Sequence, residues 1–291
     1  MDLSEVVVHA LLQGLTTVLP LSETGHQVAA RIWLGSDRGL PALSSIAQLG
    51  CLVALVVVVR QRLARAFTEG IRGLARPAIL QSSEGGRDAV AMVLASLVAA
   101  TSDILLRPYV SELNATPLVV GAGLLLTAAG LASTTLTPPP RHLTPAAAGA
   151  LLVGLAHGLA AVPGASRIGA AFIVLRWLGV GGWRAAEAAL LMSVPVMALQ
   201  VARLALETPK VGMLGGGLIT LVALLSCAGA LLGASLWRAL CERNRTVWLS
   251  LWLVPLALAV LGYGRALPQP VEQLPVRGDV AHIAPRPSSR C

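Results

Sequence analysis

The first polar cluster of this chain lies in the otherwise apolar stretch LPLSETGHQVAARIWLG, residues 19–35. It places Ser22, Glu23, Thr24 and His26 within five positions. Hydroxyl groups can donate hydrogen bonds to phosphate oxygens, and a histidine can act as nucleophile, general acid or general base. If a helix starts here, His26 shares a face with Glu23, three residues earlier. The cluster predicts chemistry on a phosphorylated ligand, with Ser22, Glu23 and His26 as the candidate catalytic residues.

A second cluster, VPGASRIG at 162–169, also interrupts an apolar region and contains Ser166 and Arg167. An arginine at membrane depth costs about 2.5–3.5 kcal/mol on insertion scales, so it needs a partner. Its guanidinium group matches phosphate oxygens. The alternative is an internal salt bridge to Glu23 or Glu187, which would be compatible with a ligand that opens the pair.

The two clusters belong to an internal repeat. QGLTTVLPLSETG (13–25) and HGLAAVPGASRIG (157–169) share Gly-Leu, a proline, a serine and a closing glycine, with one gap. In each, a helix is predicted to begin just after the cluster, and helix N-termini carry free N–H groups and partial positive charge. We expect the two starts to form one anion site, and the residues predicted to bind phosphate are Arg167, Ser166, Thr24, Gly164 and Gly25. The bland alternative is chance recurrence in an Ala/Leu/Gly-rich chain.

The composition indicates which elements position these clusters. Of 291 residues, 55% are hydrophobic and 12% charged, against about 25% charged in soluble domains. The fold class predicted is an all-α integral membrane protein with six transmembrane helices and two re-entrant helical hairpins in inverted repeats. The hairpins cover 3–35 and 146–180, because broken backbone at membrane depth persists only inside protein or along a watery cavity. The expected spans are 43–60, 88–106, 117–136, 184–206, 212–236 and 246–263.

Arginine placement predicts the orientation. The Arg-rich segments 60–87 and 237–245 should be cytoplasmic, so the first hairpin enters from the outside and the second from the inside. The prediction is one polytopic domain over 1–264, with repeat one at about 1–136 and repeat two at about 145–264. A Pro-rich tail, 265–291, is expected to be disordered.

Other classes are excluded on composition. The net charge of +8 comes almost entirely from arginine, without interleaved aromatics, so no nucleic-acid partner is expected. The four cysteines lack metal-ligand spacing. Asp2 and Glu5 stand where a signal peptide needs positive charge, so the N-terminus is expected to be part of the fold.

Together with AQLG at 47–50, QGLTTVLPLSETGH and PGASRIGAA resemble the undecaprenyl-diphosphate phosphatase family, also called bacitracin-resistance proteins. The resemblance implies a multi-pass enzyme of the bacterial plasma membrane whose site opens to the outer, periplasmic side. Such enzymes remove the terminal phosphate of undecaprenyl diphosphate with a divalent cation, Mg²⁺ or Ca²⁺, and recycle the lipid carrier for cell-wall synthesis. By position, Ser22, His26, Ser166 and Arg167 fall on family active-site positions.

The chain departs from the family pattern EGLTEFLPVSSTGH. The two acidic positions hold Gln13 and Thr17, and the second serine is replaced by Glu23. We expect Glu23 to take over the metal-binding or base role, with Gln13 as a second metal ligand. Supporting roles are predicted for Gln13, Thr17, Gln48 and Glu187.

Two readings of the function stay open at this level. Hydrolysis of a polyprenyl diphosphate is favoured, and a membrane protein that binds or translocates polyprenyl phosphates without hydrolysis is the alternative, since inverted repeats with broken helices also build transporters. The attacking group can be His26, Ser22 or a water. A homodimer also stays open, because the sequence does not give the oligomeric state.

Overall fold

The structure is a computed structural model that describes residues 3–34, 40–110, 113, 116–207 and 215–266. Within these residues the chain folds almost entirely as helices. Five helices are long and apolar enough to cross a membrane, namely Leu43–Ala75, Glu84–Val110, Pro117–Leu136, Gly182–Arg203 and Gly216–Glu242. The protein is therefore all-α and has the helices of an integral membrane protein.

Both regions that contain a polar cluster are broken helices. The halves of the first are α1 (Leu3–Val18) and α2 (Glu23–Leu34), and those of the second are α7 (Ala147–Leu159) and α8 (Arg167–Trp177). The predicted helix starts after the clusters are thus confirmed. Each break turns through a residue in the left-handed region, Ser22 with φ 69° and Gly164 with φ 82°. This conformation is easy for glycine and strained for serine.

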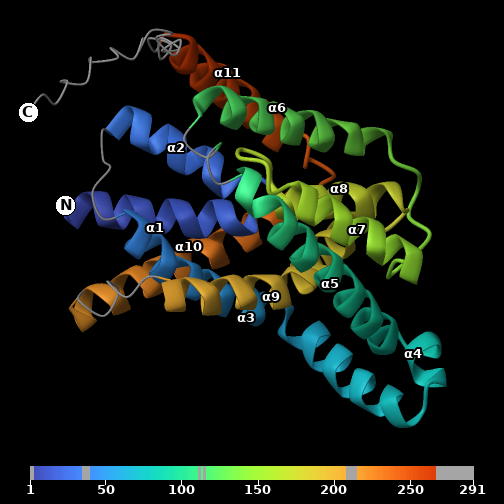
Figure 1. Cartoon of the computed structure of the whole chain (residues 1–291). Helices are drawn as coiled ribbons and strands as arrows, with labels where there is room; N and C mark the ends of the chain where they lie inside the picture. The colour runs from blue at the N-terminus through green and yellow to red at the C-terminus, as the bar shows by residue number, and fades with distance from the viewer. Residues whose placement is uncertain (1–2, 35–39, 111–112, 114–115, 208–214, 267–291) are drawn as a thin grey trace, which may run out of the picture.

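The two broken helices approach each other from opposite ends of the bundle (Figure 1). The α1–α2 pair and the α7–α8 pair point inward, and their breaks meet near the middle. One hydrogen bond joins the breaks directly, since the Gly164 N–H donates to the Thr24 hydroxyl oxygen at 3.0 Å. The polar clusters, 140 residues apart in sequence, therefore form one site.

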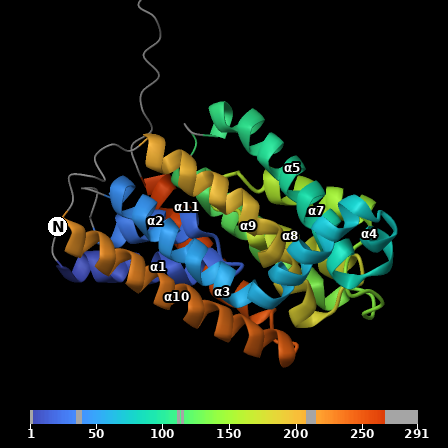
Figure 2. The same cartoon turned by 90° about the horizontal axis from the view of Figure 1, so that it is seen from below.

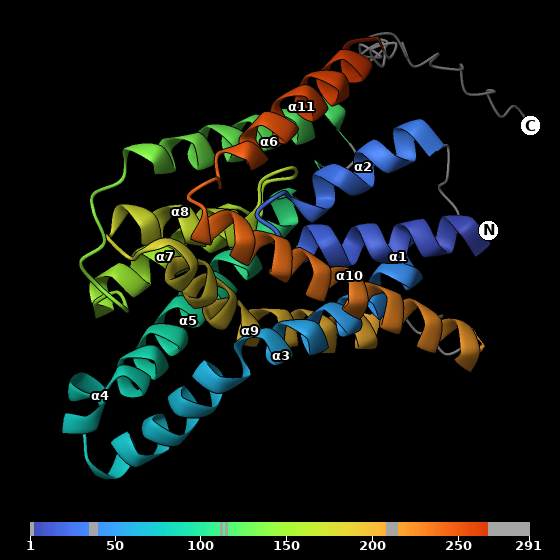
Figure 3. The same cartoon turned by 180° about the vertical axis from the view of Figure 1, so that it is seen from behind.

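The remaining helices surround this meeting point in a reciprocal pattern. They are α3 (Leu40–Ala75), α5 (Glu84–Val110), α6 (Pro117–Ser133), α9 (Gly182–Glu207), α10 (Gly216–Glu242) and α11 (Trp248–Ala266). α1 packs along α10 while α7 packs along α5, and the pairs α3–α9 and α6–α11 also contact. Figure 2 shows α3 and α9 side by side between α10 and α5, and Figure 3 shows α6 along α11. Each broken helix thus rests on a helix from the other half of the chain.

Two glycines make the reciprocal contacts close. A side chain at Gly14 would collide with the Ser226 backbone of α10, and one at Gly158 would collide with Ser102 of α5. Gly14 and Gly158 are the matching glycines of the internal repeat. They fix the depth at which each broken helix sits against its partner, because close helix packing in membranes depends on small residues.

The structure corrects the predicted element lengths. α3 continues past residue 60 to Ala75 and is followed by the short helix α4 (Ala78–Ser82), so most of the predicted cytoplasmic loop 61–87 is helical. The segment after residue 60 is rich in Arg, Ala and Leu, which favour helix. Its positive charge does not prevent α3 from continuing through it. The apolar part of α11, Trp248–Gly264, is shorter than each of the five long apolar helices named above. Residues 267–291 of the predicted tail lie outside the described part of the chain.

The helical extension of α3 begins at a buried ion pair. Arg62 is 1% exposed, and it donates to both carboxylate oxygens of Asp88 on α5, the longer bond at 2.7 Å. It also reaches Glu187 on α9 at 3.5 Å. A buried guanidinium needs such partners to offset its desolvation. The supporting role predicted for Glu187 at the phosphate site stays a prediction, and in this structure its carboxylate pairs with Arg62 at a different place in the fold.

Candidate functional site

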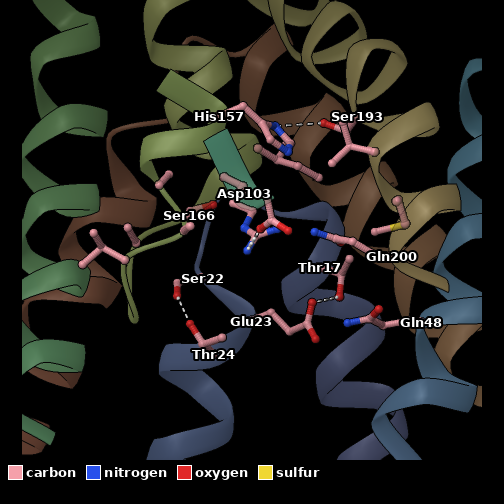
Figure 4. Close-up of a pocket in the computed structure, with 18 of the residues that line it drawn as sticks. Thr17, Ser22, Glu23, Thr24, Gln48, Asp103, His157, Ser166, Ser193 and Gln200 are labelled. Atoms are coloured by element: carbon pink, nitrogen blue, oxygen red, sulfur yellow. Dashed lines mark hydrogen bonds and ion pairs between the residues drawn. The ribbon is translucent and has the colours of Figure 1, made fainter. Parts of the chain in front are cut away.

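A cavity of about 440 Å³ lies where the two breaks meet (Figure 4). Its volume is in the usual range of small-molecule sites. The walls come from both broken helices, α1–α2 and α7–α8, and from α3, α5 and α9. The polar residues that line it are Thr16, Thr17, Ser22, Glu23, Thr24, Gln48, Asp103, Arg107, His157, Ser166, Arg167, Ser193, Gln200 and Arg203.

Glu23 forms one end of the cavity and is held there by uncharged donors. Its Oε1 accepts from the Gln13 amide at 3.0 Å and from the Gln27 amide at 3.1 Å. Its Oε2 accepts from the Thr17 hydroxyl at 3.0 Å. Figure 4 shows Thr17 and Gln48 beside this carboxylate. The three bonds fix the carboxylate in place, and a carboxylate oxygen can accept more than one such contact.

The first break uses its own side chains to cap α2. The Ser22 hydroxyl accepts from the Gly25 N–H at 3.2 Å and lies 3.3 Å from the Thr24 hydroxyl. The N–H groups of Gly25 and Gly164 are thus already engaged, by Ser22 and Thr24 respectively. Neither glycine lines the cavity. Their predicted part in phosphate binding stays a prediction, and this geometry shows them shaping the turn and joining the two breaks.

The second break is built in the same way. The Ser166 hydroxyl caps α8 by accepting from the Gly169 N–H at 3.1 Å. The Ser166 N–H donates to the Thr127 hydroxyl on α6 at 2.9 Å. These bonds place Arg167, the first residue of α8, in the cavity wall. The start of α8, with the partial positive charge that a helix N-terminus carries, thus lies at the cavity.

Arg167 has an internal partner that the sequence analysis did not identify. Its guanidinium lies 2.8 Å from the Asp103 carboxylate of α5, and Arg203 of α9 approaches the same carboxylate at 4.0 Å. An internal salt bridge was the alternative considered for Arg167, with Glu23 or Glu187 as partner, and the structure forms one with Asp103 instead. The missed signal was Asp103 itself, an acidic residue well inside the predicted apolar span 88–106, since ionisable residues at such depth mark functional sites.

A second missed residue is His157, which lies in the last turn of α7 and lines the cavity. It is 7% exposed, and its Nδ1 lies 3.5 Å from the Ser193 hydroxyl of α9. Figure 4 shows His157 and Ser193 together at the end of the cavity opposite Glu23. The repeat alignment contained the signal, because His157 matches Gln13.

The structure places His26 outside this cavity. Its ring does not line the cavity but stacks beside Trp252 of α11. The indole N–H of Trp252 donates to Nε2 at 3.0 Å, and Nδ1 lies 2.9 Å from the Ser22 carbonyl oxygen. Both ring nitrogens are therefore engaged. A catalytic role for His26 stays a prediction that this geometry does not favour.

The residues predicted to hold a cation lie at the Glu23 end. Gln13 is fully buried behind the wall, and its Nε2 also donates to the Ser44 carbonyl at 3.0 Å. The Oε1 atoms of Gln13 and Gln48 are buried without a hydrogen-bond partner. One carboxylate and two unpartnered amide oxygens are hard oxygen donors of the kind that Mg²⁺ and Ca²⁺ prefer. Within the described residues no group of three His, Cys, Asp or Glu side chains could hold a metal.

Fold and site together define a class of protein. Two helix starts, three arginines and six hydroxyl-bearing side chains line a cavity enclosed by long apolar helices. Such an arrangement suits an anionic group attached to an apolar remainder. The class is an integral membrane protein with a polar cavity between two broken helices.

Comparison with known proteins identifies the family. A family model described as bacitracin resistance protein BacA matches residues 6–259, so the chain belongs to that family. A relative from Korarchaeum cryptofilum, named undecaprenyl-diphosphatase, is 32% identical over 68% of this chain and 75% of its own length. Undecaprenyl-diphosphatase 2 of Stutzerimonas stutzeri is 33% identical over 68% of this chain and 74% of its own length. The resemblance drawn from the sequence motifs is confirmed.

Proposed function

We propose that this protein hydrolyses undecaprenyl diphosphate to undecaprenyl phosphate and inorganic phosphate. The observation that carries the proposal is the position of Arg167, at the start of α8 and in the wall of a cavity formed by both breaks. The names of its relatives give the same substrate. The alternative of binding or translocation without hydrolysis is not favoured, and the assay below tests it.

Phosphate binding follows from groups that face the cavity. Arg167 offers a planar pair of donors that matches two phosphate oxygens. Ser166, Ser22 and Thr24 offer hydroxyl groups, and each hydroxyl that already accepts a capping bond still has its proton to donate. A phosphate would take the place that the Asp103 carboxylate holds against Arg167. Catalysis then consists mainly of positioning and of neutralising charge on the phosphate oxygens.

A divalent cation, Mg²⁺ or Ca²⁺, fits the Glu23 end of the cavity. Glu23 would hold it with the unpartnered oxygens of Gln13 and Gln48, aided by substrate phosphate, since Mg²⁺ is commonly bound through one or two carboxylates and phosphates. When bound, the cation would neutralise charge on the diphosphate. This assigns Glu23 the role of the acidic residues that Gln13 and Thr17 replace. A carboxylate at Glu23 that faces a diphosphate is repulsive unless a cation or a proton lies between them.

The membrane arrangement extends the proposal. We infer six spans, with α11 as the sixth, and two re-entrant hairpins that enter from opposite sides. The opposed approach of the two broken helices in Figure 1 and the reciprocal packing support this arrangement. The host is the bacterial plasma membrane, and the Arg-rich end of α3 would face the cytoplasm. The site would open toward the outer side. A homodimer stays a prediction.

The test is phosphate release by the purified chain from undecaprenyl diphosphate in detergent micelles with Mg²⁺ or Ca²⁺. The parent protein should release phosphate, and Arg167→Ala should lower kcat/KM by at least 100-fold, because it removes charge-assisted bonds of about 1.5–3 kcal/mol each.

Arg176→Ala is the matched control, since it removes the same charge from the far end of α8, where the side chain bonds the Val180 carbonyl. It should keep activity within about threefold. Binding of the lipid without phosphate release by the parent would refute hydrolysis and favour the carrier alternative.

A further inference from the structure

We propose that His157, from the second repeat, is the general base that activates the attacking water. This inference rests on the proposed hydrolysis. Its starting point is the set of titratable side chains in the cavity wall, which among the described residues are Glu23, Asp103, His157 and three arginines. Arginine does not act as a base at neutral pH. The choice is therefore among two carboxylates and one imidazole.

Both carboxylates are committed to other contacts. Glu23 accepts three side-chain hydrogen bonds, from Gln13, Gln27 and Thr17. Asp103 is paired with Arg167 at 2.8 Å, with Arg203 at 4.0 Å beyond. The lone pairs of these carboxylate oxygens are thus already directed at side-chain donors. These groups are suited to fix a cation and an arginine, and less suited to collect a proton during the reaction.

The surroundings of His157 leave one nitrogen available as a base. The Ser193 hydroxyl donates its proton to the Ala189 carbonyl at 2.7 Å, so toward His157 it can only accept. Nδ1, at 3.5 Å from this oxygen, is then the protonated nitrogen. Nε2 keeps its lone pair. The tautomer that a general base needs is thus set by a residue on α9, which packs against the hairpin.

The backbone holds His157 firmly at this place. The next residue, Gly158, contacts Ser102 so closely that no side chain fits, and Gly154 makes the same kind of contact with Ala95 one turn earlier. Ser102 precedes Asp103, the partner of Arg167. The same turn of α5 therefore positions both the His157 imidazole and Arg167, the arginine proposed to bind phosphate.

The repeat explains why the base would come from the second half. His157 occupies the position that Gln13 has in the first repeat, and the adjacent glycines make reciprocal contacts, with α5 and α10. Gln13 points to Glu23 at one end of the cavity, and His157 stands at the opposite end in Figure 4. Glutamine cannot take up a proton. His157 supplies, from the symmetry-related position, the proton acceptor that position 13 lacks.

The placement also suits an in-line displacement, in which attacking and leaving oxygens lie on opposite sides of phosphorus. A water at the His157 end gives its proton to Nε2 as its oxygen bonds to the terminal phosphorus. The bond from phosphorus to the bridging oxygen breaks, and its electron pair stays on undecaprenyl phosphate. The proton on His157 then passes to solvent.

The experiment measures phosphate release by the full chain and by His157→Gln, which keeps size and hydrogen bonding but cannot accept a proton. We expect kcat to fall at least 100-fold with KM within threefold, as for loss of a general base. His142→Gln, which removes a histidine outside the cavity, is the control and should stay within threefold of the parent. Imidazole added to His157→Ala should restore at least tenfold, and imidazole added to His26→Ala should not.

Folding is checked by binding of undecaprenyl phosphate, whose affinity in His157→Gln should stay within threefold of the parent. A His157→Gln variant with kcat within tenfold of the parent overturns the inference alone, as does selective rescue of His26→Ala by imidazole. Absence of phosphate release by the parent overturns the proposed function and the inference together.

Discussion

Replacing Gln13 by Glu should make the stability of this protein depend on a divalent cation. The Gln13 amide donates to Glu23 at 3.0 Å and to the Ser44 carbonyl at 3.0 Å. Glutamate has the same shape and no donor, so both bonds are lost and a second carboxylate faces the first. Gln13 is fully buried, which leaves little water to screen the pair.

The magnitude follows from this geometry. A hydrogen bond to a charged group contributes about 1.5–3 kcal/mol. Two like charges about 4 Å apart repel by about 4 kcal/mol at an effective dielectric constant of about 20. Because one carboxyl can take up a proton, the two contributions do not add in full, and we expect a loss of about 3–6 kcal/mol. At roughly 2–4 °C per kcal/mol, the melting temperature should fall by about 10 °C.

The assay is thermal unfolding of Gln13→Glu in detergent, with a chelator and then with millimolar Mg²⁺ or Ca²⁺. The cation should restore most of the loss, because binding to the folded state alone stabilises it by mass action. Gln13→Glu combined with Glu23→Gln should unfold near the parent temperature in the chelator, since one carboxylate remains. Gln200→Glu adds the same charge to the cavity wall from α9 and is the control. Unfolding of Gln13→Glu that is unaffected by the cation would refute a cation-binding role for this end of the cavity.

Two further predictions concern the framework of the site. Arg62→Met should lower the free energy of unfolding by about 3–5 kcal/mol, because it leaves the Asp88 carboxylate buried without its counter-charge. In thermal unfolding, the double variant Arg62→Met with Asp88→Leu should be more stable than Arg62→Met alone. A double variant that is less stable than Arg62→Met would contradict this explanation. Thr24→Val removes the acceptor that joins the two breaks through the Gly164 N–H and should lower kcat/KM about tenfold, whereas Thr220→Val, exposed on α10, should not. Unchanged kinetics for Thr24→Val would show that the breaks stay together without this bond.

Much of the architecture could be predicted from local patterns in the sequence. Residues close together in sequence determine where the long apolar helices lie. They also determine where the chain breaks, at a proline and a glycine, and where α2 and α8 begin. The match between 13–25 and 157–169 further predicted that both breaks belong to one site. Span lengths were less predictable. An arginine such as Arg62 predicts the end of a membrane span. In the structure Arg62 is instead buried against Asp88, and α3 continues to Ala75.

The identity of the residues that face the ligand was harder to predict, because it depends on contacts between distant elements. Arg167 was placed in the cavity from its type and position, but its partner Asp103 lies 64 residues earlier and was found only in the folded chain. His26 and His157 have the same chemistry, and each lies close in sequence to one of the two polar clusters. The structure turns His26 toward Trp252 and His157 toward the cavity.

The sequence by itself determined that this chain lies in a membrane, breaks two helices at polar clusters and carries the motifs of its family. These properties follow from composition and short-range pattern. The tertiary structure alone decided which side chains share the cavity, which ion pairs form and which histidine is available. The physical reason is that a side chain's surroundings depend on how each helix is rotated against its neighbours, and those neighbours come from the other half of the chain.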